Sequence, residues 1–249
     1  MAKTVIITGG GSGIGKATAT KFAKGNYNVI IMGRSKKALM NTTKEIKQNI
    51  AWQQVDVSKR KEVTTAIKAI VKQYGTIDIL VNNAGTSGGF ITSDPIAEAE
   101  IIWNNILETN LKGSFLMAMA IAPHLSRPGG RIINISSIAA QMGGSRAGAM
   151  AYAAAKAGIH GLTFSLAREL GPEGITANVI APGLITNTMF FGSRSLPQER
   201  IDQTISQTPM RRTGQPIDIA EAIYFLASDK ASFITGEIFN VNGGWLFGR

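Results

Sequence analysis

Short apolar runs of strand length alternate along the chain with segments in which apolar residues recur every three or four positions. The runs at residues 5–7, 27–32 and 77–81 are followed within two residues by glycine or asparagine, and the segments at 14–24 and 37–48 are amphipathic. Further strands are predicted at 52–57, 131–135, 176–180 and, at one edge, 236–244, and further helices at 58–74 and from 217 onward. Such alternation predicts an α/β fold with a doubly wound parallel sheet, whose ligand binds at the carboxyl ends of the strands.

The first predicted strand leads directly into a glycine-rich loop, TGGGSGIG at residues 8–15, and a helix follows. In such a loop Gly9 permits a tight turn, Gly13 lets the backbone approach a pyrophosphate, and Gly15 lets the helix lie close to the strand. The helix N-terminus adds N–H donors and a positive dipole end. Because a strand and a helix flank the loop, we predict a dinucleotide-binding site made by Gly9, Gly11, Ser12, Gly13, Ile14 and Gly15.

The residues after the second predicted strand indicate which dinucleotide binds. An Asp or Glu here bonds the ribose 2′-hydroxyl of NAD, whereas an Arg suits the 2′-phosphate of NADP. The chain has Gly33-Arg34, then Lys36 and Lys37, and no carboxylate between residues 26 and 44. We therefore expect NADP rather than NAD as the cofactor. The alternative interpretation makes Arg34 an ordinary solvent-facing turn residue.

Two further strand ends supply candidate cofactor contacts. Asp56 and Val57 end the third predicted strand, where Asp56 either accepts a hydrogen bond from an adenine amine or caps the helix that starts near Ser58. The fourth strand ends in NNAG at residues 82–85, and small residues there let a flat cofactor lie against the backbone. The predicted contacts at this strand end are Asn83, Ala84 and Gly85.

Tyr152 and Lys156 are candidate catalytic residues because a helix places positions i and i+4 on one face. A phenol with a pKa of about 10 exchanges protons poorly at neutral pH, and a neighbouring cation favours the phenolate. Lowering that pKa to about 7 requires roughly 4 kcal/mol, which a desolvated ammonium and a cationic ring would supply together. Taken alone, such a pair on an alanine-rich helix usually means a half-buried ring beside a solvated lysine, so the assignment depends on the rest of the chain.

The composition limits the classes of protein to consider. With 249 residues, 44% hydrophobic and 17% charged, the chain is long enough for one large core, and we expect a single domain over residues 1–249. There is no cysteine, which fits a reducing compartment. The first apolar run is too short for a signal peptide or a membrane span. We therefore expect a cytoplasmic protein without membrane association.

The net charge of +10 resides in the first 75 residues, where Lys and Arg far outnumber the three acidic residues Glu45, Asp56 and Glu62. A nucleic-acid footprint, attraction of an anionic cofactor or substrate, and solvated helix faces are the three possible explanations. The lysines lie on helix-like segments without interleaved aromatic residues, and no nucleic-acid motif is present. We therefore expect phosphate attraction and solvated faces, and no nucleic-acid partner.

Taken in order, these motifs resemble those of the short-chain dehydrogenase/reductase family. The resemblance covers essentially the whole chain and rests on residues 8–15, residues 82–85, Asn110, Ser136-Ser137, Tyr152 with Lys156, and Pro182-Gly183. It implies a single Rossmann-like domain with a seven-stranded parallel sheet flanked by helices on both faces. It also implies a homotetramer that assembles through helices at about 103–125 and 151–171.

The resemblance assigns a role to each catalytic candidate. Tyr152 is the general acid in carbonyl reduction and the base in the reverse direction. Lys156 holds the ribose hydroxyls and lowers the phenol pKa. Ser137 orients the substrate oxygen and is chosen over Ser136 because the family's catalytic serine is the second of such a pair. Asn110 holds a relay water to Lys156, and its alternative role is to kink a helix or bond the backbone.

The remaining candidates line the nicotinamide and substrate pockets of the family. Pro182, Gly183, Ile185 and Asn187 match the segment that grips the carboxamide, although the family often has Thr where this chain has Asn187 between Thr186 and Thr188. Residues 189–213 correspond to the substrate lid. The predicted substrate contacts are Ser137, Met142, Tyr152 and Phe190, and Phe190 equally suits a core or subunit contact. His124 and His160 lack ligand partners at metal spacing, so we expect ordinary helix residues and no metal.

The function implied is NADP(H)-dependent reduction of a ketone to a secondary alcohol, or the reverse. Within the family, 3-oxoacyl thioester reductases are the most similar, since residues 211–244 match their C-terminal third. Those enzymes often carry a basic residue where this chain has Glu173, which argues against carrier-protein docking. The alternatives are an NAD(H)-dependent alcohol, polyol, sugar or steroid dehydrogenase, a 2,4-dienoyl-CoA reductase relative, and a cofactor-binding sensor or scaffold without turnover.

Overall fold

The computed structural model describes residues 2–188 and 196–248, and its centre is one parallel sheet of seven strands. The strand order is β3-β2-β1-β4-β5-β6-β7, with every neighbouring pair parallel and β7 at an edge, as expected. From β1 the chain adds strands in one direction, through β2 to β3, and from β4 it adds them in the other direction, through β5 and β6 to β7. The switch in direction therefore lies between β1 and β4. The strands are β1 Thr4–Thr8, β2 Asn28–Gly33, β3 Ile50–Gln54, β4 Ile79–Asn82, β5 Arg131–Ile135, β6 Thr176–Pro182 and β7 Ile238–Val241.

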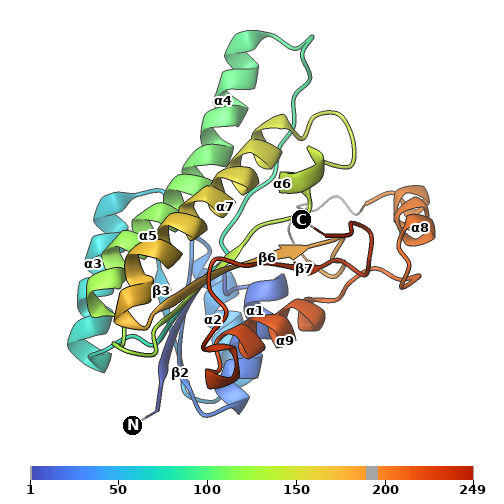
Figure 1. The fold of residues 1–249 in the computed structure, drawn as a ribbon. Helices are drawn as coiled ribbons and strands as arrows, with labels where there is room; N and C mark the ends of the chain where they lie inside the picture. Colours follow the sequence, from blue (N-terminus) through green and yellow to red (C-terminus); the bar gives the residue numbers. More distant parts are fainter. Residues whose placement is uncertain (1, 189–195, 249) are drawn as a thin grey trace.

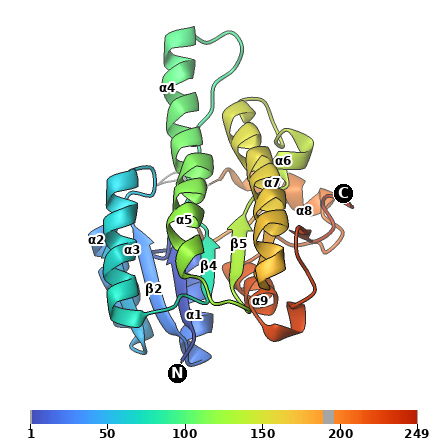
Figure 2. The same ribbon diagram turned by 60° about the vertical axis from the view of Figure 1, so that its left-hand side comes forward.

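Helices cover both faces of the sheet, as Figures 1 and 2 show. One face carries α1 Gly13–Lys24, α2 Lys36–Ile46 and α9 Pro216–Leu226, and the other carries α3 Arg60–Tyr74, α5 Gly113–Ile121 and α7 Met150–Leu170. This is the doubly wound α/β architecture predicted from the sequence, and the prediction is confirmed. No helix in the described ranges is long and apolar enough to cross a membrane.

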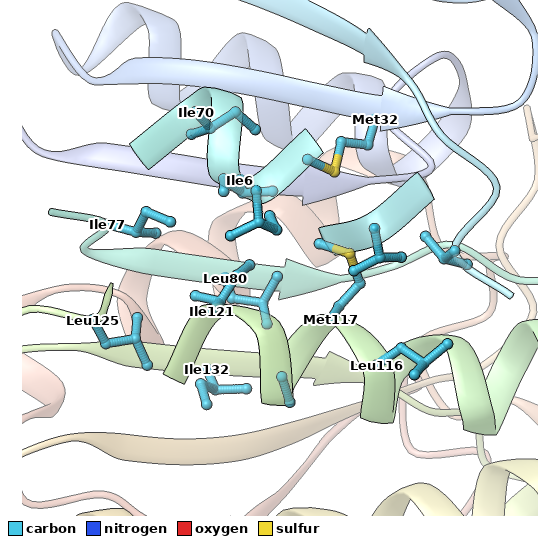
Figure 3. Packing of buried hydrophobic residues seen from close by; sticks show 14 of the residues in the cluster. Ile6, Met32, Ile70, Ile77, Leu80, Leu116, Met117, Ile121, Leu125 and Ile132 are labelled. Atoms are coloured by element: carbon cyan, nitrogen blue, oxygen red, sulfur yellow. The ribbon is translucent and has the colours of Figure 1, made fainter. Parts of the chain in front are cut away.

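Two cores form because successive strand residues point to opposite faces. On β1, Ile6 packs toward α3 and α5, whereas Val5 and Ile7 pack toward α1 and α9. Figure 3 shows the first of these cores, in which side chains from the strands meet Ile70 and Met117 from the covering helices. Full burial of a side chain of this size contributes about 1.5–3 kcal/mol, so the central strands hold the carboxyl edge of the sheet rigidly in place.

The long helix predicted at 103–125 is longer and less regular in the structure. It begins at α4 Ile96–Leu107, where Pro95 stands at the N-cap position, and reaches beyond the sheet (Figure 1). A π-helical turn, Glu108–Lys112, then joins α4 to α5. Single π-turns of this kind are frequent at functional sites. The turn carries Asn110, so the irregularity places a candidate site residue.

Two other boundaries differ from the prediction. The third strand ends at Gln54 instead of residue 57, so Asp56 and Val57 lie in the following loop. The stretch at 189–213, predicted to be irregular, contains helix α8 Gln198–Gln207. Thr204 is buried within this helix, and Thr208, which follows the helix end, is also buried and donates from its hydroxyl to the Thr204 carbonyl oxygen.

Candidate active site

A cavity of about 1100 Å³ opens at the carboxyl edge of the sheet, where α/β sheets bind their ligands. Its wall begins at the glycine loop after β1, continues past the ends of β4, β5 and β6, and includes the start of α7 and part of α8. The predicted residues that line it are Gly9, Ser12, Gly13, Ile14, Asn83, Gly85, Ser137, Met142, Tyr152, Lys156, Pro182, Gly183 and Ile185.

The glycines of the loop allow a close packing of backbone that side chains would prevent. A Cβ on Gly15 would lie 2.3 Å from the Gly9 carbonyl oxygen, and one on Gly9, whose φ is +68°, would lie 2.8 Å from the Asn83 amide nitrogen. The Ser12 side chain makes no capping hydrogen bond to α1. The first turn of α1 therefore presents backbone N–H groups at the cavity wall, an arrangement that fits the pyrophosphate of a dinucleotide.

The hydroxyl of Thr8 fastens this loop to the end of β4. Its Oγ1 accepts hydrogen bonds from the backbone N–H groups of Asn83 and Ala84, each at 2.9 Å. The Asn83 amide donates in return to the Thr8 carbonyl oxygen at 2.9 Å. The predicted contacts Asn83 and Ala84 thus hold the two strand ends together, and Asn83 also faces the cavity.

Ser137, Tyr152 and Lys156 meet in one corner of the cavity. Ser137 follows β5, and its hydroxyl is hydrogen-bonded to that of Tyr152 on α7. The Ser137 oxygen also accepts from the Ala139 N–H at 3.1 Å. Lys156 donates from Nζ to the Ile135 carbonyl oxygen at 2.7 Å, and its Nζ lies 5.7 Å from the centre of the Tyr152 ring. The predicted catalytic pair therefore shares one face of a helix, as expected.

Burial sets the protonation of this corner. It raises the pKa of Tyr152 to about 12, and the hydrogen bond from Ser137 opposes this only in part. Burial also lowers the pKa of Lys156 to about 8. Desolvation dominates the phenol pKa in this arrangement. Tyr152 therefore keeps its proton across the neutral range. That Lys156 and a cationic ring together lower this pKa stays a prediction.

The side chains of the adjacent residues Ser136 and Ser137 lie in different surroundings. The Ser136 hydroxyl donates to the Lys156 carbonyl oxygen at 3.0 Å and lies 2.9 Å from Nε2 of His160. Burial, followed by the charge of Lys156, lowers the pKa of His160. The sequence interpretation of His160 as an ordinary helix residue missed this contact, although its spacing of four from Lys156 puts both on one helix face. Ser136 and His160 thus join α7 to β5 behind the site.

Asn110 is fully buried beside the same corner. Its amide nitrogen donates to the Thr86 carbonyl oxygen at 2.9 Å, and its oxygen accepts from the Thr86 N–H at 3.1 Å. A Cβ on Gly85 would lie 2.7 Å from that oxygen and 3.8 Å from Nζ of Lys156. The side chain therefore bonds the backbone, the alternative left open from the sequence, and the water-relay role stays a prediction.

Arg34 and Asp56 lie outside the large cavity, at the ends of β2 and β3. Arg34 is exposed, and its carbonyl oxygen accepts from the Gln54 amide at 3.0 Å. Although burial raises the pKa of Asp56, hydrogen bonds from the Ser58 N–H and hydroxyl, with the charge of Arg34, hold it below its usual value. Asp56 thus caps the turn before α3. The predicted contact Val57 is buried in the core, and Gly11 and Gly15 lie within the loop.

In the segment after β6, Asn187 lies outside the large cavity. Its amide donates to Oε1 of Gln215 at 2.8 Å, and the residue lines a smaller cavity of about 460 Å³ between α1 and α9. Thr188 instead lines the large cavity, and a Cβ on Gly13 would lie 3.2 Å from its Cβ. Thr188 is therefore the better candidate for a cofactor contact, and the hydroxyls on both sides of Asn187 were the signal for it.

The substrate end of the cavity is built from loops. Met142 lies at the end of the short helix α6 Ala139–Met142 and lines the cavity, whereas Phe190 lies outside the described residues. Sequence reasoning missed several residues of this wall, among them Phe90, Arg146, Arg200 and Trp245. Within the described ranges, no three His, Cys, Asp or Glu side chains gather as metal ligands.

Comparison with known proteins agrees with this geometry. Residues 9–246 match the family described as enoyl-(acyl carrier protein) reductase. The chain is 40% identical over 252 residues to the 3-oxoacyl-[acyl-carrier-protein] reductase of Staphylococcus epidermidis, covering 98% of this chain and 99% of that protein. It is 38% identical over 245 residues to the enzyme of the same name from Vibrio cholerae, covering 97% and 96%.

A solved structure with the same fold comes from Brucella melitensis and is described as a short-chain dehydrogenase/reductase, glucose/ribitol dehydrogenase. It superimposes with a TM-score of 0.89 at 30% identity, covering 99% of this chain and 97% of that one. The chain therefore belongs to the short-chain dehydrogenase/reductase family and is an oxidoreductase that acts on CH–OH and C=O groups.

Proposed function

We propose that the protein is an NADPH-dependent reductase that converts a 3-oxoacyl thioester to the 3-hydroxyacyl thioester. The observation that carries this proposal is the hydrogen-bonded pair of Ser137 and Tyr152, which lies beside Lys156 in the cavity that begins at the glycine loop. The names of the relatives from Staphylococcus epidermidis and Vibrio cholerae supply the substrate class.

The cofactor residues fit a nicotinamide dinucleotide. Gly9, Ser12 and Gly13 line the cavity next to the α1 N-terminus, where backbone N–H groups suit a pyrophosphate. Lys156, buried and cationic at neutral pH, suits the ribose hydroxyls. Arg34, at the end of β2, suits a 2′-phosphate. When bound, the dinucleotide supplies the hydride.

Ser137, Tyr152 and Lys156 act on the carbonyl oxygen of the substrate. The Tyr152 hydroxyl donates its proton to the carbonyl oxygen as that oxygen gains negative charge, and the Ser137 hydroxyl donates a second hydrogen bond that orients it. A Tyr152 pKa of about 12 keeps the phenol protonated at neutral pH, which is the state that proton donation requires. Lys156 adds a positive charge close to the phenol, and Asn110 fixes the adjacent loop through Thr86.

The reaction is tested with matched thioesters. We expect NADPH to be consumed with an acetoacetyl thioester and not with a crotonyl thioester, which has a C=C bond instead of a ketone. Two hydroxyls that converge on one point suit an oxygen acceptor, whereas reduction of a C=C bond delivers a proton to carbon. Ribitol and glucose with NAD test the activity named for the Brucella protein. Turnover only with crotonyl thioester, or only with polyols, would refute the proposal.

The cofactor preference is tested by titration. Trp245 lines the cavity, so tryptophan fluorescence reports binding of NADPH and NADH. We expect NADPH to bind at least about tenfold more tightly, and the preference to collapse in Arg34→Ala, since one charge-assisted contact to a phosphate is worth about that factor. Arg168→Ala, an exposed arginine near the far end of α7, is the control that keeps the preference. Equal or tighter NADH binding would indicate the alternative, an NAD-dependent dehydrogenase.

We also propose a cytoplasmic homotetramer of single-domain subunits, with residues 189–213, including α8, over the substrate. Apolar side chains remain exposed on α5 and α7, among them Phe115 at 44%, Met119 at 57% and Phe164 at 41%. An apolar surface of this kind indicates a subunit interface. Light scattering on the purified protein should give four times the subunit mass of 26.4 kDa, and a monomer would exclude this assembly.

A further inference from the structure

Two arginines that the proposed chemistry does not use face the outer part of the active-site cavity. Arg146 lies in the loop between α6 and α7, and Arg200 lies in the first turn of α8. The two segments are 55 residues apart in the chain and are joined by a hydrogen bond from Nη2 of Arg200 to Oγ of Ser145 at 3.3 Å. The fold therefore brings two guanidinium groups to the same part of the cavity wall, which we call the cavity mouth.

These arginines are not neutralised by carboxylates. Within the described ranges, neither takes part in an ion pair. The charged residues that line the cavity as a whole are Asp94, Arg146, Lys156 and Arg200, so positive charge exceeds negative charge on its wall. Glu199 and Asp202 share α8 with Arg200 but do not line the cavity, and the Asp202 carboxylate accepts from Gln198.

The electrostatics of these two arginines favour binding of an anion between them. Burial, followed by the neighbouring charge of Arg146, lowers the pKa of Arg200. Arg200 is half-buried and Arg146 is exposed, and two like charges held close together cost free energy that an anion bound between them would offset. Arginine presents a planar set of donors that suits phosphate oxygens.

We propose that Arg146 and Arg200 bind the phosphate of the substrate and so select 3-oxoacyl groups carried on a phosphorylated pantetheine arm. This inference rests on the proposed function and adds the recognition of the carrier. Coenzyme A and an acyl carrier protein both present an acyl thioester on such an arm. Glu173, which takes the place of a basic residue often found in carrier-dependent relatives, is paired with Arg127. Arg146 and Arg200 thus recognise the substrate phosphate within the cavity itself.

The test compares thioesters that share the acetoacetyl group and differ in charge. The neutral substrate is acetoacetyl-N-acetylcysteamine, and the anionic ones are acetoacetyl-phosphopantetheine, acetoacetyl-CoA and the acetoacetyl carrier protein. We expect KM for the three anionic substrates to rise about tenfold in Arg146→Gln and in Arg200→Gln, since each loses a charge-assisted contact. Values of kcat and KM for the neutral thioester, and KM for NADPH, should stay unchanged.

Two controls separate this effect from general electrostatics. Arg168→Gln removes an exposed arginine near the far end of α7 and should leave every KM unchanged. Raising the salt concentration should raise KM for the anionic substrates and not for the neutral one. A rise confined to phosphopantetheine and CoA would assign the site to free thioesters, and a rise that includes the carrier protein would extend it to that source.

The outcomes distinguish the two proposals. If wild-type protein reduces the thioesters but Arg146→Gln and Arg200→Gln leave KM for the anionic ones within a factor of two, the inference is wrong and the proposed function stands. An equal rise in KM for the neutral thioester would also overturn it, because it would indicate a structural role. Failure to reduce even the neutral thioester would overturn the proposed function itself.

Discussion

The two ends of the active-site cavity are built differently. The cofactor end consists of the glycine loop and the ends of buried central strands, and Thr8, Asn83 and Asn110 hold its segments together by backbone hydrogen bonds. The substrate end consists of loops and the short helices α6 and α8, where Met142 and Arg146 are exposed. A rigid end suits a cofactor whose shape is fixed, and an open end suits substrates that differ among enzymes of one fold.

Tyr152 lies where the two ends meet, so its removal should stop the chemistry without disturbing either end. In Tyr152→Phe, kcat should fall about a thousandfold, because a positioned proton donor contributes about 10²–10⁴. The affinity for NADPH, measured by tryptophan fluorescence, and the melting temperature should change little. A variant that kept more than a tenth of the wild-type kcat would show that another group donates the proton.

Lys156 tests the cost of burying a charge at the cofactor end. Below pH 8 the lysine is charged in both the folded and the unfolded chain, and its burial penalty is fully present. The penalty fades as pH rises from about 8 to the ordinary 10.5, since the folded protein loses the proton first. Relative to Lys156→Met, the wild type should gain about 3 kcal/mol of unfolding free energy between pH 7 and 10.5.

Denaturant unfolding of both proteins without cofactor, at several pH values, measures this difference. Contributions from other groups cancel between the two proteins. A difference that is independent of pH would mean that Lys156 is solvated in solution.

Ser136 and Ser137 are adjacent in sequence, but we expect Ser136 to support the fold and Ser137 to support the reaction. In Ser137→Ala, kcat should fall about a hundredfold while stability is kept, because a donor to the reacting oxygen is lost. In Ser136→Ala, unfolding free energy should fall by about 1–3 kcal/mol, because the buried ring of His160 loses its partner. Steady-state rates and denaturant unfolding on both variants check this, and the reverse pattern would exchange the two roles.

The glycine loop tests how rigid the cofactor end is. In Gly15→Ala, the new Cβ would clash with the Gly9 carbonyl oxygen at 2.3 Å, so unfolding free energy should fall by about 1–3 kcal/mol and NADPH binding should weaken. The control Gly171→Ala has helical dihedral angles and no atom within 4 Å, and should change stability by about 1 kcal/mol or less, on the stabilising side. Equal changes in unfolding free energy in the two variants would show that the glycine loop shifts to accommodate a side chain.

The same contrast explains what the sequence could predict. Strand and helix order, the glycine loop and the Tyr152–Lys156 pair follow from local patterns, because periodicity and i, i+4 spacing are properties of short segments. The π-turn at Asn110 depends on bonds to Thr86, which is distant in the chain, so a helical pattern alone predicted a regular helix there.

The substrate end was predicted least well, for a physical reason. Arg146 and Arg200 meet only because two loops converge, and neither belongs to a motif. Likewise, the raised pKa of Tyr152 depends on burial, which the spacing of a tyrosine and a lysine does not reveal. Contacts between distant segments, and the desolvation they produce, therefore required the structure.

The central claim is that hydride passes to a ketone carbon while Tyr152 donates a proton to the ketone oxygen, with Ser137 and Lys156 assisting. Its most direct test is a single turnover with NADPH deuterated at C4 on the transferred face and an acetoacetyl thioester, with the product analysed by mass spectrometry and NMR. We expect one deuterium at carbon 3, the carbon that bears the new hydroxyl. Deuterium at another carbon, or no transfer with either face labelled, would contradict the account.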